Sequence, residues 1–125
     1  MDQPWRNLQA GCDVDAWIAE GIPDGIIFAP HCPVGDNYPE HLDLRPYARQ
    51  SQGRVGIYGQ VWRQSSGIQA EALAAELYEQ GVNGVAFYES NLAVTRSSLR
   101  ERLWRFGHPR FCRTLSGPEE PRRVP

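Results

Sequence analysis

Polar side chains recur at the ends of three apolar runs. In proteins built on parallel strands, functional residues commonly lie at such strand ends. His31, Gln60 and Glu89 occupy these positions at even 29-residue intervals. Trp62 and Asn91 continue two of them into the following loops. Because ligands of parallel α/β sheets gather at the carboxyl ends of the strands, this set suits sugar binding or acid–base chemistry. The alternative is that each is only a polar residue emerging into solvent.

The candidate roles follow from the side-chain chemistry. Glu89 is the candidate catalytic residue, because burial at a strand end favours the neutral carboxylic acid that a general acid requires. Gln60 neither ionises nor releases a proton readily, so it is expected to orient a ligand hydroxyl, as is His31. Trp62 can stack on the apolar face of a sugar. We therefore expect His31, Gln60, Trp62 and Asn91 to bind substrate.

Metal and cofactor chemistry is not expected. The three cysteines make no even disulfide framework, so we expect unpaired thiols. His31-Cys32 and the His108-x3-Cys112 pair supply four candidate zinc ligands, but structural zinc sites prefer closely spaced cysteine pairs, which this sequence lacks. It also lacks a P-loop, a G-x-G-x-x-G turn after a strand, a G-x-S-x-G elbow and an H-E-x-x-H motif.

Charge and hydropathy argue against two classes of partner. Thirteen basic and fifteen acidic residues give the 125-residue chain a net charge of -2, which favours neither nucleic acid nor a membrane surface. No apolar run approaches the ~20 residues that a membrane-spanning helix needs. The first residues, MDQPWRNLQAG, do not resemble a signal peptide. The cellular location stays open.

The stretch 70–90, AEALAAELYEQGVNGVAFYES, predicts a helix, a tight turn and a buried strand. Its apolar residues follow the i, i+3, i+4, i+7 spacing of an amphipathic helix, and Glu71, Glu76 and Glu79 are expected on the solvated side. Gly81 stands where a left-handed residue commonly ends a helix. The run after Asn83-Gly84 does not alternate in polarity, which is typical of parallel strands.

This unit recurs along the chain, since AEGIPDGIIF and YEQGVNGVAFY share a helix end, a turn and a Gly-led strand. The pattern predicts an α/β fold of three parallel βα units, with strands near 26–30, 55–61 and 85–89, and a closing helix after Thr95. Residues 1–12 are expected to be a lead-in, 13–107 the folded domain, and 108–125 an irregular or disordered tail. Alternation along the strands predicts one shared face containing Ile27, Tyr58 and Phe87.

Three segments carry a family resemblance. GCDVDAWIAEGIPDGIIFAP, LDLRPYARQSQGRVGIYGQV and the stretch 70–90 resemble the C-terminal part of bacterial glycoside-hydrolase-like, family-10-type (β/α)8 proteins over residues 11–106. The resemblance implies the last three strands of a TIM barrel and carbohydrate as the substrate class. In many barrel glycosidases the nucleophile ends the seventh strand, and Gln60 is the matching residue here.

Three functions are consistent with this sequence. The favoured one is the C-terminal part of a glycoside hydrolase, inactive alone because cleavage needs two carboxylates and only Glu89 is well placed. A partner carboxylate would be Asp36, Glu40 or a residue of another segment. The alternatives are a carbohydrate-binding barrel fragment without catalysis and a small α/β domain that acts through protein contacts. Open sheet edges also predict self-association of the isolated chain.

Overall fold

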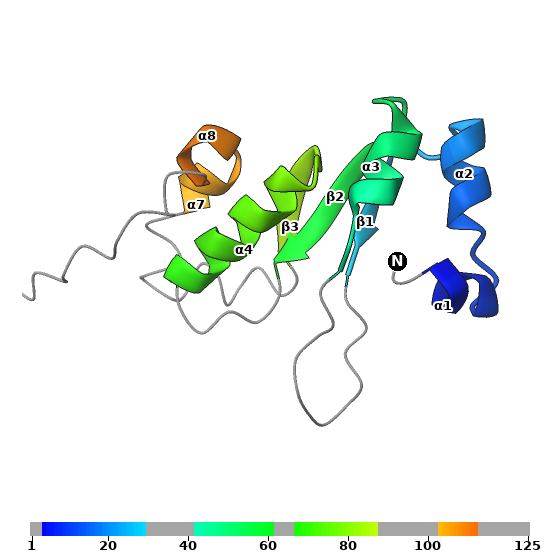
Figure 1. Cartoon of the computed structure of the whole chain (residues 1–125), viewed down its shortest axis with the longest axis horizontal. Helices are drawn as coiled ribbons and strands as arrows, with labels where there is room; N and C mark the ends of the chain where they lie inside the picture. Colours follow the sequence, from blue (N-terminus) through cyan, green and yellow to red (C-terminus); the bar gives the residue numbers. More distant parts are fainter. Residues whose placement is uncertain (1–3, 30–41, 62–66, 88–102, 113–125) are drawn as a thin grey trace, which may run out of the picture.

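The computed structural model describes residues 4–29, 42–61, 67–87 and 103–112 of the chain (Figure 1). Each predicted strand forms within these ranges, and a helix joins each strand to the next. The helices and strands are, in order, α1 (Pro4–Gln9), α2 (Val14–Glu20), β1 (Gly25–Phe28), α3 (Arg45–Ser51), β2 (Gly56–Val61), α4 (Gly67–Glu79), β3 (Gly84–Phe87), α7 (Leu103–Phe106) and α8 (Pro109–Cys112).

The strands form an open parallel sheet in the order β1-β2-β3. Gly25 pairs with Gly56 at the start of the first ladder, and Tyr58 pairs with Gly84 at the start of the second. The protein is therefore a mixed α/β structure, and the prediction of three parallel strands is confirmed. Figure 1 shows the three strands running in the same direction, so that their carboxyl ends lie at one edge.

Both crossover helices pack on the same face of this sheet. The Tyr47 ring of α3 stacks on Phe28 of β1, with ring centroids 4.4 Å apart. Leu77 of α4 rests on Gly59 of β2, where an added Cβ would come within 2.6 Å of the leucine side chain. Because Phe28 and Gly59 are register partners, they point to the same side of the sheet. We call this side the helix face and the other side the open face.

Capping residues set the ends of the helices as the sequence indicates. The Asp13 side chain accepts a hydrogen bond from the Ala16 amide at 3.0 Å and so caps α2. Gly21 ends that helix in the left-handed conformation, and Gly81 has a similarly positive φ after α4. The predicted cap of α3 by Asp43 differs in detail, because its carboxylate accepts from the Arg45 amide while Leu44 occupies the capping position.

Short helices lie at both ends of the described chain. Helix α1 forms within the predicted lead-in, and α8 forms beyond residue 107, where an irregular tail was predicted. Cys112 of α8 is fully buried, because α7 and α8 pack together on α4. Residues 95–102 of the predicted closing helix lie outside the described residues. No helix in the described part of the chain is long and apolar enough to cross a membrane.

Candidate functional site

The carboxyl edge of the sheet is the candidate site, and Gln60 is its one predicted residue within the described ranges. Gln60 lies on β2, the central strand, one residue before the strand ends. His31, Trp62, Glu89 and Asn91 lie outside the described residues, in the segments that follow the three strands. The parallel order places the carboxyl ends of the three strands at the same edge of the sheet.

Strand register decides which side chains share a face with Gln60. Register partners point to the same side of a sheet, and Gln60 pairs with Ala86 while Tyr58 pairs with Gly84. Ile27 pairs with Tyr58 and therefore also lies on the open face. The open face thus consists of Ile27, Tyr58, Gln60 and Ala86, together with the strand-leading glycines Gly25, Gly56 and Gly84.

The predicted face of the third strand is wrong. Val85 and Phe87 pair with Gly59 and Val61, which places them on the helix face. Phe87 there packs edge-on against Phe106 of α7, with ring centroids 5.0 Å apart. The alternation expected to place Glu89 beside Gln60 therefore fails at Val85 and Phe87.

Gln60 is buried without a complete set of hydrogen bonds. Only 8% of its surface is exposed, and its Nε2 atom has no hydrogen-bond partner among the described residues. Its register partner, Ala86, offers only a methyl group on that side. An unpaired buried donor costs about 1–3 kcal/mol, so an acceptor that reaches Nε2 would be favoured at this position.

Towards the amino ends of the strands, the open face is covered by an aromatic ring from its own central strand. A Cβ added at Gly25, Gly56 or Gly84 would come within 2.9, 2.7 or 3.1 Å of the Tyr58 ring. The three glycines therefore let the ring lie flat across all three strands. Even so, 36% of Tyr58 and 54% of the adjacent Ile27 remain exposed.

The amino edge of the sheet is held by side chains that bond to the backbone. Asn83 makes two hydrogen bonds to the backbone of Ile57. Its side-chain Oδ1 accepts from the Ile57 backbone N–H at 2.8 Å, and its backbone N–H donates to the Ile57 carbonyl at 2.7 Å. Ser51 donates to the Val55 carbonyl at 2.6 Å. These residues satisfy backbone groups where the strands begin, so we interpret this edge as structural.

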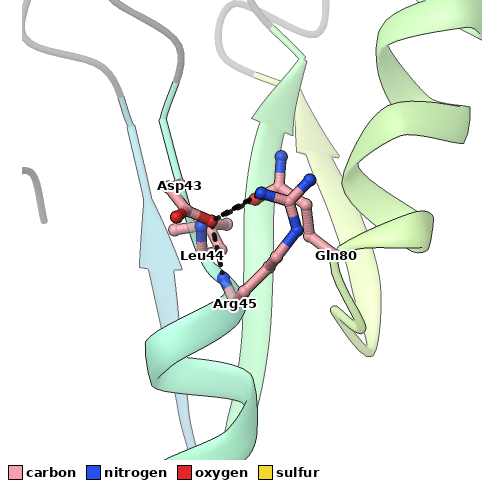
Figure 2. Close-up of polar contacts among 4 residues, drawn as sticks. All are labelled: Asp43, Leu44, Arg45 and Gln80. Carbon is pink, nitrogen blue, oxygen red and sulfur yellow. Dashed lines mark hydrogen bonds and ion pairs between the residues drawn. The ribbon is translucent and has the colours of Figure 1, made fainter.

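A second buried glutamine, Gln80, has a hydrogen-bond partner for its side-chain oxygen. Gln80, which directly follows α4, is 7% exposed, and its Oε1 accepts a hydrogen bond from the Leu44 amide at 2.6 Å. Figure 2 shows Gln80 reaching towards the start of α3, where Asp43 and Arg45 also lie. This bond joins the end of α4 to the start of α3. The pattern of the sequence did not single out Gln80.

A buried polar cluster joins α4 to α7 and α8. Glu71 was predicted on a solvated face, but it is fully buried, and its Oε1 lies 3.1 Å from the Arg105 guanidinium. The Tyr78 hydroxyl donates to the Phe106 carbonyl, and the Cys112 thiol donates to the Arg105 carbonyl at 3.4 Å. These contacts fix the C-terminal helices on α4 and lie on the helix side, away from the open face.

Burial perturbs two groups of this cluster. Desolvation raises the pKa of the Cys112 thiol, and the negative charge of Glu71 raises it further, while Arg105 lowers it. Desolvation also raises the pKa of Tyr78. Both groups therefore stay neutral at neutral pH, and the thiol is poorly suited to act as a nucleophile. Among the described residues, no three histidine, cysteine or acidic side chains gather as a metal site.

Comparison with protein families, with curated proteins and with solved structures finds no match to this chain.

Proposed function

We propose that the chain forms the last three βα units of a (β/α)8 barrel that acts on carbohydrate, and that it is inactive without the remaining units. The observation that supports this proposal is the open face of the sheet. Ile27 and Tyr58 remain exposed there, whereas helices cover the opposite face. Parallel sheets are normally covered on both faces, so the exposure of Ile27 and Tyr58 is the feature that needs an explanation.

The order of the strands supports a barrel over a doubly wound sheet. Doubly wound sheets reverse their strand order and carry helices on both faces. Here the order is consecutive, and α3 and α4 lie on the same face. In a barrel the helices form an outer ring and the inner strand faces pack against one another. Ile27 and Tyr58 would then be interior side chains, with the strand-leading glycines making room for the Tyr58 ring.

The proposed chemistry is glycoside cleavage at the carboxyl edge. Gln60 binds the sugar together with His31, Trp62 and Asn91, and Glu89 protonates the leaving oxygen. Because β3 ends at Phe87, two residues before Glu89, strand alternation does not fix the direction of this carboxyl group. A second carboxylate has to come from another segment, since an amide at position 60 is neither a nucleophile nor a base.

The test joins the chain to an upstream segment encoding five further βα units and measures hydrolysis of aryl glycosides and polysaccharides. We expect turnover by the joined protein and none by the chain alone. In the joined protein, Glu89→Gln should reduce turnover by 10²-fold or more, roughly the range of general acid catalysis. Glu79→Gln is the matched control, because Glu79 is exposed at the end of α4, and it should leave turnover unchanged.

Two outcomes would contradict the proposal. Turnover by the isolated chain would show that three βα units suffice for activity. The exposed face of the sheet would then not be explained by absent barrel units. Full turnover by joined Glu89→Gln would remove the catalytic role of that residue. A joined protein that binds sugars without cleaving them would instead support a carbohydrate-binding barrel fragment.

A further inference from the structure

The two buried glutamines of the described chain differ in one respect. Gln60 and Gln80 are 8% and 7% exposed, so neither amide is solvated by bulk water. Gln80 has a structural partner, because its Oε1 accepts from the Leu44 amide. Gln60 has an Nε2 group with no partner among the described residues. A buried amide that bonds to the fold stabilises it, whereas one left unpaired destabilises it.

We infer that the side-chain amide of Gln60 donates a hydrogen bond to a ligand. The residue serves this role although it lowers the stability of the fold. It lies on the central strand next to the carboxyl edge, where ligands of parallel sheets bind, and on the open face rather than under the helices. The facing residue of β3 offers the amide no side-chain partner, because it is Ala86, and the ladder with β1 ends one residue earlier at Gly59. The Nε2 group is therefore interpreted as a donor available to a ligand.

The chemistry of the amide defines what fills this position. Nε2 carries two N–H donors and accepts nothing, so its partner is an oxygen with a free lone pair. The amide is neutral at all ordinary pH values and does not demand a charged partner. A hydroxyl or ring oxygen of a neutral sugar meets both conditions. This choice of ligand class rests on the proposed function, whereas the unpaired state of Gln60 does not.

The test compares Gln60→Met with Gln80→Met in the full chain at equal protein concentration. Methionine nearly conserves the volume of glutamine and removes the amide. Gln60→Met should leave Tm unchanged or raise it, because it removes an unpaired polar group. Gln80→Met should lower Tm by roughly 4 °C or more, because it leaves the buried Leu44 amide unpaired.

The ligand arm adds glucose, galactose and xylose separately to each protein. At least one sugar should raise the Tm of the unchanged chain and of Gln80→Met, and the rise should be lost in Gln60→Met. A fall in the Tm of Gln60→Met as large as that of Gln80→Met would overturn the inference, because the amide would then be structural. A full sugar response in Gln60→Met, or no response of the unchanged chain to any of the three sugars, would overturn it too.

These results can be separated from the proposed function. Turnover is measured on the joined protein, while the Tm comparison uses the chain by itself. A joined protein without turnover, beside a chain whose sugar response needs Gln60, would reject the glycoside hydrolase and keep the binding role. Turnover by the joined protein, beside a chain whose sugar response does not need Gln60, would reject only the role of Gln60.

Discussion

Leu77 of α4 sits directly on Gly59 of β2, so close that a Cβ on the glycine would come within 2.6 Å of the leucine side chain. Leu77 is buried in the core and has little room to move. This contact sets how closely the helix approaches the sheet, because any side chain at position 59 would push α4 outward.

Gly59→Ala should therefore destabilise the fold by about 1–3 kcal/mol through overpacking, measured by denaturant unfolding. In Gly59→Ala/Leu77→Ala the clash disappears, so the double variant should be less destabilised than the sum of the two single changes. Gly107→Ala is the control, since nothing lies within 4 Å of the position of its Cβ. Strict additivity of positions 59 and 77 would contradict the contact.

The ion pair between Glu71 and Arg105 should matter far more than the surface pair between Asp43 and Arg45. Glu71 is fully buried 3.1 Å from the Arg105 guanidinium, so Arg105→Ala removes a close positive charge from a desolvated carboxyl group and should cost about 3 kcal/mol. Both partners of the other pair are 56% exposed, and Arg45→Ala should cost about 1 kcal/mol or less. Denaturant midpoints of the two variants measure the difference. Equal effects would contradict a larger stabilising role for the buried pair.

Stability should fall at alkaline pH because the pKa of Cys112 is raised in the folded chain. A raised folded pKa leaves stability intact below the ordinary thiol pKa of about 8.5 and reduces it as pH rises through the folded value. The raised pKa of Tyr78 acts in the same direction at higher pH. Cys112→Ala should flatten the loss of stability above the ordinary thiol pKa of about 8.5, as measured by denaturant unfolding. An unchanged pH profile in Cys112→Ala would contradict this assignment.

Thiol reactivity checks the same burial independently. Cys112 is fully buried, while Cys12 is partly exposed. With Cys32 replaced by serine, one thiol of the folded chain should react with an aromatic disulfide reagent much faster than the other. Mass spectrometry of the labelled peptides should identify Cys12 as the fast one. Faster labelling of Cys112 would mean that α8 does not stay on α4.

Local patterns predicted the elements well, because they depend on nearby residues. Asp13 and Gly21 bound α2 as their types indicate, and the apolar runs form the three strands. The face of β3 was missed because equal 29-residue spacing was taken as the register. The paired bonds between Asn83 and Ile57 instead bring Gly84 beside Tyr58, and a one-residue slip reverses every side chain. The strand-leading glycines were the available signal, since they mark the open face on all three strands.

Long-range partners could not be predicted from spacing. Glu71 has the helical position of a solvated residue, and only the packing of α7 against α4 turns it inward onto Arg105. The unpaired state of Gln60 likewise depends on what neighbouring strands offer, which a sequence pattern does not contain. Position 60 was predicted as a site residue from the strand end alone, and the register places it on the face that alternation predicted, together with Ile27 and Tyr58.

The central claim is that the open face of the sheet is an interior surface without its cover, and the mass of the isolated chain tests it most directly. Light scattering should give a mass above the 14.1 kDa of one chain, because exposed Ile27 and Tyr58 favour association. Ile27→Ser should lower that mass, whereas Leu8→Ser, which changes an equally exposed residue on α1, should not. A monodisperse 14.1 kDa monomer with a sharp thermal transition would contradict the account.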